Sequence, residues 1–281
     1  MKLLVFGRTG QIATEIAKRA PNATLLSRDQ ADLTDPAGCA NAIAAHAPRA
    51  VINAAAYTAV DRAEEEEALA HRINADAPDA MARTCAQHGI PLIHISTDYV
   101  FNGTGTQAWA PGDPTTPINA YGRTKLAGEA AVRAAGGTHA ILRTSWVFSA
   151  YGGNFVKTML RVSATRAELN VVDDQIGGPT HAGDIAAVCL TLAEALLATP
   201  DKAGTYHFSG TPDVSWKGFA EAIFTQAARE VAVMGIPTSN WPTPAPRPLN
   251  SRLDCSSLEA TFDIPRPDWQ TALDKVIKEI S

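Results

Sequence analysis

The chain has 281 residues, of which 46% are hydrophobic and 19% charged, with a formal net charge of -5 at pH 7. This balance is typical of one large globular domain or two closely joined ones, and it excludes a disordered chain. The negative charge argues against nucleic acid as a main partner, because phosphate backbones attract basic surfaces. Neither a signal peptide nor a long apolar span is evident, so we expect a cytoplasmic protein that does not enter a membrane.

Short apolar runs alternate with helical patterns in the first half of the chain. The predicted strands are 2–6, 23–26, 50–53, 91–95 and 140–144. The predicted helices are 11–19, 36–46, 61–88 with an interruption near Ala77-Pro78, and 117–135. Such alternation is typical of an α/β fold, in which a parallel sheet carries helices on both faces. Right-handed crossovers make it a doubly wound sheet of the Rossmann type.

After residue 150 the alternation becomes less regular. We expect residues 1–150, rejoined by a strand and a helix near 168–198, to form the Rossmann domain. Residues 151–167 and 199–281 are expected to form a smaller C-terminal lobe. Prolines cluster in the segment PTSNWPTPAPRP at 237–248, which predicts an ordered loop rather than a helix.

The cysteines are expected to be reduced and buried. The chain has four of them: Cys39, Cys85, Cys189 and Cys255. They stand far apart, and none has the C-x-x-C spacing typical of zinc sites or thioredoxin-like chemistry. Small core residues in a reducing compartment are the simplest interpretation.

A glycine-containing turn, GRTGQIA at 7–13, joins the first predicted strand to the first helix. In the spacing G-x-x-G-x-x-A, glycine lets the backbone turn tightly and approach a pyrophosphate, which free N–H groups of the helix then hold. The place between a strand and a helix favours dinucleotide binding over a purely structural turn. Residues 1–150 are therefore expected to bind NAD(P). The predicted contacts are Gly7, Thr9, Gly10, Gln11 and Ile12.

The second predicted strand ends near the place where the cofactor ribose is recognised. About twenty residues past the turn, NAD-binding folds place an acidic residue on the ribose hydroxyls. Here Ser27-Arg28 occupy that place, and both side chains can hold a 2′-phosphate. This favours NADPH, with two exposed loop residues as the alternative, so the cofactor is left as NADPH or NADH. Asp32 and Leu33 follow and are predicted to border the adenine.

Tyr121 and Lys125 form a Y-x-x-x-K pair on one face of a predicted helix. An ammonium beside a phenol stabilises the phenolate, so we expect the pKa of Tyr121 to lie below its usual value of about 10. Such a phenol can act as a general acid toward a developing alkoxide. The fourth strand ends in Ser96-Thr97-Asp98, and ligands of open α/β sheets bind beyond the carboxyl ends of strands. A hydroxyl of Ser96 or Thr97 is thus predicted near the reacting carbonyl.

These motifs resemble those of the short-chain dehydrogenase/reductase superfamily, in its extended branch of nucleotide-sugar enzymes. Within that branch the chain is similar to the dTDP-4-dehydrorhamnose reductases along nearly its whole length. The segments that carry the resemblance are GRTGQIA (7–13), NAAAYTAVDRAE (53–64), STDYVFNG (96–103), P-x-N-x-YGRTKLAGE (117–129), RTSWVF (143–148), NFVKTML (154–160), DDQIGGPT (173–180) and RPLNSRLD (247–254). The later segments are the more diagnostic, because every family of the superfamily carries the early ones.

The resemblance implies a reaction and its catalytic residues. The implied reaction reduces the C4 ketone of dTDP-4-keto-L-rhamnose to dTDP-L-rhamnose, with hydride from NADPH or NADH, for the synthesis of cell-surface polysaccharide. By motif position, Tyr121 donates the proton and Thr97 orients the ketone. Lys125 lowers the pKa of Tyr121 and binds the nicotinamide ribose. Ala54, Ala55 and Ala56 are implied to line the cofactor channel.

The smaller lobe is implied to bind the substrate, a dTDP-sugar. The implied substrate contacts are Thr58, Val60, Thr97, Asp98, Trp146 and Arg247. Two interpretations of Arg247 and Arg252 stay open. The two arginines clamp the diphosphate through charge-assisted hydrogen bonds, or they are ordinary surface residues. Trp216, Trp241 and Trp269 are interpreted as core or loop anchors. For Trp109, in the loop before the catalytic helix, packing is favoured over contact with a ligand.

Two departures from the family pattern leave the implied chemistry untouched. Ala13 replaces the third glycine of the turn, and Tyr57 stands where histidine is frequent. Some relatives have been linked to Mg²⁺, but no pattern of oxygen ligands here predicts a metal site. Two other functions remain open: another extended-branch activity, such as an epimerase or dehydratase, and a non-catalytic NADP-binding regulatory subunit. A dehydratase normally has an acidic pair after its threonine, and here Asp98 stands alone. The oligomer is left as monomer or homodimer.

Overall fold

Six strands form one parallel sheet in the computed structural model, which describes residues 1–280. The strands are β1 (Leu3–Phe6), β2 (Thr24–Leu26), β3 (Ala50–Asn53), β4 (Leu92–Thr97), β5 (His139–Thr144) and β10 (Gly204–His207). They lie in the order β10-β5-β4-β3-β1-β2, and every neighbouring pair is parallel. The predicted doubly wound α/β sheet is confirmed.

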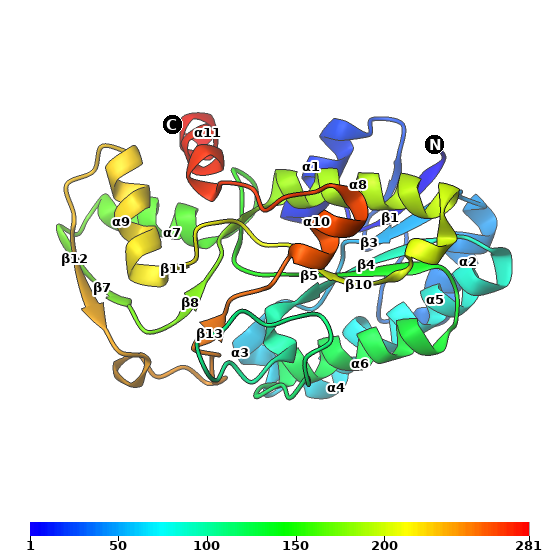
Figure 1. Cartoon of the computed structure of the whole chain (residues 1–281), viewed down its shortest axis with the longest axis horizontal. Coiled ribbons are helices and arrows are strands. Elements are labelled where there is room, and N and C mark those ends of the chain that lie inside the picture. Colours follow the sequence, from blue (N-terminus) through cyan, green and yellow to red (C-terminus); the bar gives the residue numbers. More distant parts are fainter. Residues whose placement is uncertain (281) are drawn as a thin grey trace.

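Helices cover both faces of this sheet (Figure 1). One face carries α1 (Gln11–Arg19), α8 (Ala182–Ala198) and α10 (Ser256–Phe262), and the other carries α2 (Pro36–His46), α5 (Ala77–His88) and α6 (Ala120–Ala134). Successive side chains of a strand point to opposite faces. Within β1, Val5 accordingly packs into the core below α8, whereas Phe6 packs into the core that contains α2 and α5. Burial on both faces explains why the strands are continuous apolar runs.

The direction of winding reverses between β1 and β3. From β1 the chain passes outward to β2, and it then crosses back so that β3 lies on the other side of β1. In open α/β sheets, ligands bind at such a reversal, in the crevice beyond the carboxyl ends of the strands. Gly7 follows β1 and Ala54 follows β3, and Ala54 donates a backbone hydrogen bond to Phe6 at 3.0 Å. The topology therefore places the two segments side by side at the crevice.

The helical segment before β4 is more continuous than predicted. It consists of α3 (Val60–Ala63), α4 (Glu67–His71), a π-helical turn η1 (Arg72–Asp76) and α5. The chain passes from α4 through η1 into α5, and the interruption predicted near Ala77-Pro78 is this π turn. Pro78 lies in the first turn of α5, directly after the π turn.

A second lobe stands at one end of the sheet, with its own core (Figure 1). Helices α7 (Phe155–Ser163), α9 (Trp216–Gln226) and α11 (Trp269–Ile280) pack there with the parallel pair β7 (Glu168–Val172) and β12 (Ala232–Ile236). Short strands connect the two parts: β6 (Val147–Phe148) pairs with β9 (Thr180–His181), and β8 (Ile176–Gly177) lies between β11 (Val214–Ser215) and β13 (Asn250–Ser251). Three 3-10 turns complete the chain: η2 (Asp98–Val100), η3 (Pro200–Lys202) and η4 (Thr238–Asn240).

The boundary between sheet and lobe differs from the predicted one. Helix α8 packs on the central sheet as expected, but the strand expected to rejoin the sheet before it, β7, pairs with β12 in the lobe. The central sheet instead gains β10 beside β5, from a segment assigned to the lobe. The physical reason is visible in β7, where Leu169 and Val171 are buried while Glu168 and Asn170 are exposed. Such alternation suits a sheet with one face in solvent.

Two other predictions about the chain are confirmed. All four cysteines are buried and free, and burial raises the thiol pKa of Cys39, Cys85 and Cys189 to about 12. The proline-rich segment 237–248 forms a loop with the single turn η4. In the described part of the chain, no helix combines the length and the apolar character needed to cross a bilayer.

Candidate active site

A cavity of about 870 Å³ opens at the reversal of the sheet, within the size range of small-molecule sites. All the predicted cofactor contacts line it: Gly7, Thr9, Gly10, Gln11, Ile12, Arg28, Asp32, Leu33, Ala54, Ala55, Ala56, Tyr121 and Lys125. Four of the predicted substrate contacts line it too: Thr58, Thr97, Asp98 and Trp146. The fold therefore brings together segments that lie more than a hundred residues apart in the sequence.

The turn after β1 has the geometry of an anion site. Gly7 has a φ of 106°, in the left-handed region that favours glycine, and a Cβ there would lie 3.4 Å from the Ala54 carbonyl. Helix α1 begins at Gln11 with Gly10 as its N-cap, and no side chain caps it. Its first backbone N–H groups thus lack a side-chain acceptor and are left to bind an anion such as a pyrophosphate.

Arg28 lies on the cavity wall after β2 with its side chain 76% exposed. Its guanidinium pairs with Asp32 at 3.3 Å, and such an exposed pair contributes little stability. A backbone hydrogen bond from Thr34, at 2.9 Å, holds the pKa of Asp32 below its usual value. The Arg28 guanidinium can therefore turn to a ligand phosphate without leaving a buried charge behind.

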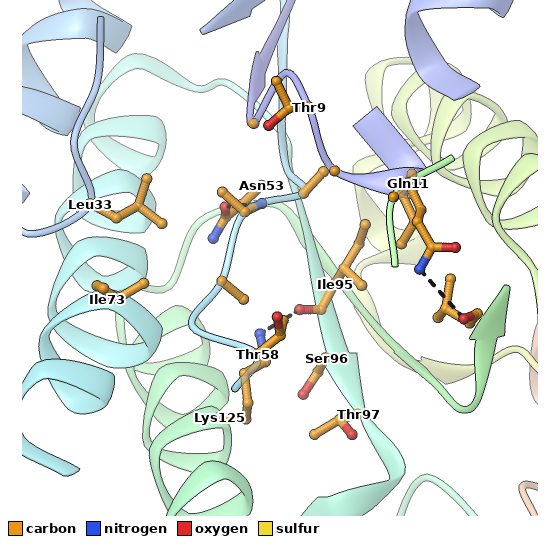
Figure 2. A pocket seen from close by; sticks show the side chains of 18 of the residues that line it. Thr9, Gln11, Leu33, Asn53, Thr58, Ile73, Ile95, Ser96, Thr97 and Lys125 are labelled. Atoms are coloured by element: carbon orange, nitrogen blue, oxygen red, sulfur yellow. Dashed lines mark hydrogen bonds between the residues drawn. The ribbon is translucent and has the colours of Figure 1, made fainter. Parts of the chain in front are cut away.

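The first turn of α6 places Tyr121 beside the end of β4. The side chain of Asn119 caps the helix by accepting a hydrogen bond from the Gly122 N–H at 2.8 Å. A Cβ on Gly122 would lie 2.2 Å from the Tyr99 carbonyl oxygen, so only glycine lets α6 approach the segment after β4 this closely. One helical turn further, the Lys125 ammonium donates to the Ile95 carbonyl at 2.7 Å (Figure 2).

The pKa of Tyr121 differs from the prediction. Burial raises it to about 12, and a hydrogen bond with Thr97 offsets only part of this shift. The expected depression by Lys125 is not observed, because the ammonium bonds to the Ile95 carbonyl, and burial lowers the pKa of Lys125 to about 8. Tyr121 is consequently protonated at neutral pH, which is the state that a proton donor needs.

Thr97 and Asp98, which follow one another at the end of β4, form a polar part of the cavity wall. The Thr97 hydroxyl donates to Asp98 Oδ1 at 3.1 Å and accepts from the Tyr99 N–H at 3.2 Å. Asp98 is only 3% exposed, and within residues 1–280 its Oδ2 has no hydrogen-bond partner. Burial raises the pKa of Asp98 to about 6, against the opposing effect of hydrogen bonds with Ser251 and Thr97. A buried oxygen without a partner on a cavity wall fits a ligand hydroxyl.

The neighbouring hydroxyl, Ser96, is engaged elsewhere. It donates to Glu129 Oε1 at 2.6 Å, and Glu129 also accepts two hydrogen bonds from Arg143 at 2.9 and 2.7 Å. Thr97 is therefore the hydroxyl left to face a ligand. The Glu129–Arg143 pair was not predicted from the sequence. A signal was present, since Glu129 follows Lys125 by four residues and shares its helix face.

Two predicted substrate contacts, Val60 and Arg247, do not line the cavity. Val60 begins α3, and the Arg247 guanidinium pairs with Asp61 at 2.9 Å. The contact of these two residues with substrate stays a prediction. For Arg247, that contact requires the guanidinium to leave its ion pair with Asp61. Trp109 stacks on Phe101 with ring centroids 4.8 Å apart, as a packing residue does.

Trp216 was interpreted as an anchor, and the structure places it in the cavity wall. No signal in the local sequence distinguishes it from the other tryptophans, because its place depends on how the lobe packs. Across residues 1–280, no group of three or more His, Cys, Asp or Glu side chains is positioned to hold a metal ion.

Comparison with known proteins decides the family. A family model described as RmlD substrate binding domain matches residues 1–281. The dTDP-4-dehydrorhamnose reductase of Sinorhizobium fredii is 44% identical over 286 residues, which cover 99% of this chain and 97% of the relative. The chain belongs to the dTDP-4-dehydrorhamnose reductase family. The family predicted from the motifs is thereby confirmed.

Two further relatives support the family assignment. The chain is similar to the solved structure of dTDP-4-dehydrorhamnose reductase from Bacillus anthracis in complex with NADP, with a TM-score of 0.92 and 34% identity over 99% of this chain and 100% of the other. It is also 36% identical, over 284 residues covering 100% of this chain and 98% of the relative, to the spore coat polysaccharide biosynthesis protein SpsK of Bacillus subtilis. The family's fold thus extends over the entire chain.

Proposed function

We propose that this protein reduces the C4 ketone of dTDP-4-keto-L-rhamnose to dTDP-L-rhamnose, with NADPH or NADH as the hydride donor. The observation that carries the proposal is the presence of Thr97, Tyr121 and Lys125 in the cavity of the phosphate-binding turn, in a chain of the reductase family. A cytoplasmic location, a monomer or homodimer, and a role in cell-surface polysaccharide synthesis belong to the same proposal. The last is supported by the name of the Bacillus subtilis relative.

We assign the two ligands to different parts of the molecule. We assign the cofactor to the central sheet, where the α1 N-terminus holds the pyrophosphate and Arg28 meets a 2′-phosphate. The bound dinucleotide supplies the hydride. The sugar nucleotide is assigned to the lobe side of the cavity, next to Trp146. In this assignment the ketone lies between the cofactor and the lobe, within reach of Thr97 and Tyr121.

Residues of the chain orient the ketone and supply the proton. Thr97 orients the ketone by turning its one hydroxyl proton from Asp98 Oδ1 to the ketone oxygen. As the hydride forms the new C–H bond at C4, the carbonyl π electrons move onto oxygen, and Tyr121 transfers its proton to the resulting alkoxide. An alkoxide is far more basic than a phenolate, so the transfer is favourable although burial raises the pKa of Tyr121 to about 12. We assign Lys125, whose ammonium donates to the Ile95 carbonyl at 2.7 Å, to the nicotinamide ribose.

An absorbance assay of the reduced nicotinamide tests the proposal. We expect the purified protein to oxidise NADPH when dTDP-4-keto-L-rhamnose is added, and to form dTDP-L-rhamnose in equal amount. An epimerase or dehydratase would convert the sugar nucleotide without net oxidation of NADPH. A regulatory subunit would bind the cofactor and leave the ketosugar unchanged. Either result would overturn the proposal.

The choice of cofactor is tested at Arg28. Replacing Arg28 by alanine should weaken NADPH binding about tenfold or more, because charge-assisted hydrogen bonds to phosphate are strong, and should leave NADH binding unchanged. Dissociation constants for both cofactors, measured by fluorescence titration, check this. Arg83→Ala is the matched control, since Arg83 forms a similar exposed ion pair with Asp79 outside the cavity. Equal effects of Arg28→Ala on both cofactors would exclude a phosphate contact.

A pH profile tests Asp98 as an acceptor for a sugar hydroxyl. Since its pKa is raised to about 6, the carboxylate is ionised above that pH and becomes protonated below it. We expect kcat/KM for the sugar nucleotide to fall as the pH drops below about 6, roughly tenfold per pH unit, because this ratio reports groups of the free enzyme. In Asp98→Asn that inflection should disappear, with a lower plateau. The same inflection in native protein and variant would assign it to another group.

A further inference from the structure

Trp216 contributes a second indole ring to the cavity wall, from a different part of the fold than Trp146. Trp146 follows β5 of the central sheet, whereas Trp216 begins α9 of the lobe. Their rings are stacked face to face, with centroids 3.6 Å apart and planes inclined by 10°. Both residues line the cavity. The stack therefore joins the lobe to the central sheet at the place assigned to the sugar.

Both indole rings, of Trp146 and of Trp216, are packed against other residues of the protein. Phe155 packs against Trp216 with ring centroids 4.6 Å apart. On Trp146, a Cβ at Gly177 would lie 2.9 Å from ring carbon Cε2, so the strand β8 approaches the ring as closely as a glycine allows. Trp146 also has a φ of 49°, a conformation that bulky residues rarely adopt and that the surrounding structure must enforce. The two rings thus form a fixed surface.

The polar edge of Trp216 is already occupied. Its indole Nε1 donates to Gln175 Oε1 at 3.1 Å, and Gln175 is buried and donates in turn to Thr238 Oγ1 at 3.1 Å. Tryptophan has a single donor and no acceptor. Trp216 can therefore offer only ring carbon to a ligand in the cavity.

The cavity wall consequently offers two chemically distinct kinds of contact to a sugar ring. Asp98 offers a carboxylate oxygen that lacks a partner, which suits a hydroxyl. The stacked indoles offer carbon, which suits a methyl group. In a 4-keto-6-deoxy sugar the reacting C4 stands between C3, which bears a hydroxyl, and C5, which bears the methyl. A C6 hydroxyl in place of that methyl would lose its bonds to water and gain none from aromatic carbon.

We propose that Trp216 is a specificity-determining residue, which together with Trp146 selects a 6-deoxy sugar nucleotide over its 6-hydroxy counterpart. The inference rests on the proposed function, because that function places C4 of the hexose beside Thr97 and Tyr121. Trp216 acts through direct contact with the C5 methyl and through its stack on Trp146. Gln175 is a positioning residue, since it orients the Trp216 ring.

The test compares two ligands that differ only at C6: dTDP-L-rhamnose and dTDP-L-mannose. Their dissociation constants are measured by calorimetry in the presence of NADPH, which forms a ternary complex that cannot react. The native protein should prefer dTDP-L-rhamnose about tenfold or more, as apolar pockets discriminate a single hydroxyl by up to about a hundredfold. In Trp216→Ala the preference should fall below about threefold, and in Trp216→Phe it should be intermediate. Trp241→Ala, which removes a 57% exposed indole outside the cavity, should behave like native protein.

Circular dichroism supplies a readout that does not depend on binding. Two indoles stacked this closely couple electronically, so Trp216→Ala and Trp146→Ala should change the near-ultraviolet circular dichroism more than Trp241→Ala does. An unchanged NADPH dissociation constant shows that each variant retains its fold. If Trp216→Ala keeps the native preference, or if native protein binds both sugars equally, the inference is wrong while the proposed function stands. If native protein binds neither sugar nucleotide, both are wrong.

Discussion

Replacing Tyr121 by phenylalanine is expected to lower kcat for the ketosugar by about 10²- to 10⁴-fold, the usual contribution of general acid catalysis. The variant keeps the ring, including its edge-to-face contact with Tyr99, and loses the hydroxyl with its acidic proton and its hydrogen bond with Thr97. Because cofactor binding depends mainly on the turn after β1, the NADPH dissociation constant should change little. Steady-state kinetics and a fluorescence titration with NADPH measure the two quantities.

A matched control separates the loss of the proton from the loss of any buried phenol. Tyr206 is also buried, and its hydroxyl donates to the Lys202 carbonyl at 2.7 Å, outside the cavity. Tyr206→Phe should therefore retain native kcat. A Tyr121→Phe enzyme that works at nearly the native rate would show that the proton comes from another group.

Replacing Glu129 by glutamine is expected to reduce the free energy of unfolding by about 3–5 kcal/mol, the usual cost of breaking a buried ion pair. The side chains of Glu129 and Arg143 are 0% and 3% exposed, so the change leaves the Arg143 charge without compensation. Urea denaturation measures the loss. Glu67→Gln is the control: Glu67 pairs with Arg123 at 2.8 Å, but its side chain is 45% exposed, and the cost should stay within about 1 kcal/mol. Equal losses in both variants would contradict a special role for the buried pair.

The same pair gives the stability a pH dependence of known sign. Burial alone would raise the pKa of Glu129, but hydrogen bonds from Arg143 and Ser96 outweigh it and hold the pKa below the usual value of 4.5. A carboxyl group whose pKa is depressed by folding stabilises the native state above its unfolded pKa, and this contribution is lost as the pH falls through the folded value. Native protein should accordingly lose stability below about pH 4.5 more steeply than Glu129→Gln.

Features encoded in contiguous residues were predictable. The apolar runs of β1, β3 and β4 reveal a buried parallel sheet because both of their faces are covered. The turn at 7–13 and the Tyr121–Lys125 pair were each recognised from a few neighbouring residues, and both lie at the cavity as predicted. The strand β7 was assigned to the wrong sheet because a short apolar run does not specify its partner, although its alternation of exposed and buried residues pointed to the lobe.

Features that depend on packing between distant elements were not predictable. Trp216 enters the cavity only because α9 of the lobe lies against the segment after β5. The pKa of Tyr121 is governed by burial, and Lys125 binds a carbonyl of β4, which no spacing along α6 reveals. Arg247 is likewise engaged by Asp61, from a segment 186 residues earlier. Each of these contacts is set by tertiary structure and not by local sequence.

The transfer of a labelled hydride tests the proposed reaction most directly. NADPH deuterated at the transferable position of the nicotinamide is incubated with the protein and dTDP-4-keto-L-rhamnose, and the product is analysed by nuclear magnetic resonance. We expect dTDP-L-rhamnose with deuterium at C4 of the sugar, formed in proportion to the cofactor oxidised. Deuterium at another carbon, a product epimeric at C4, or a label that remains in the cofactor while the sugar is converted would contradict hydride transfer to C4 in this cavity.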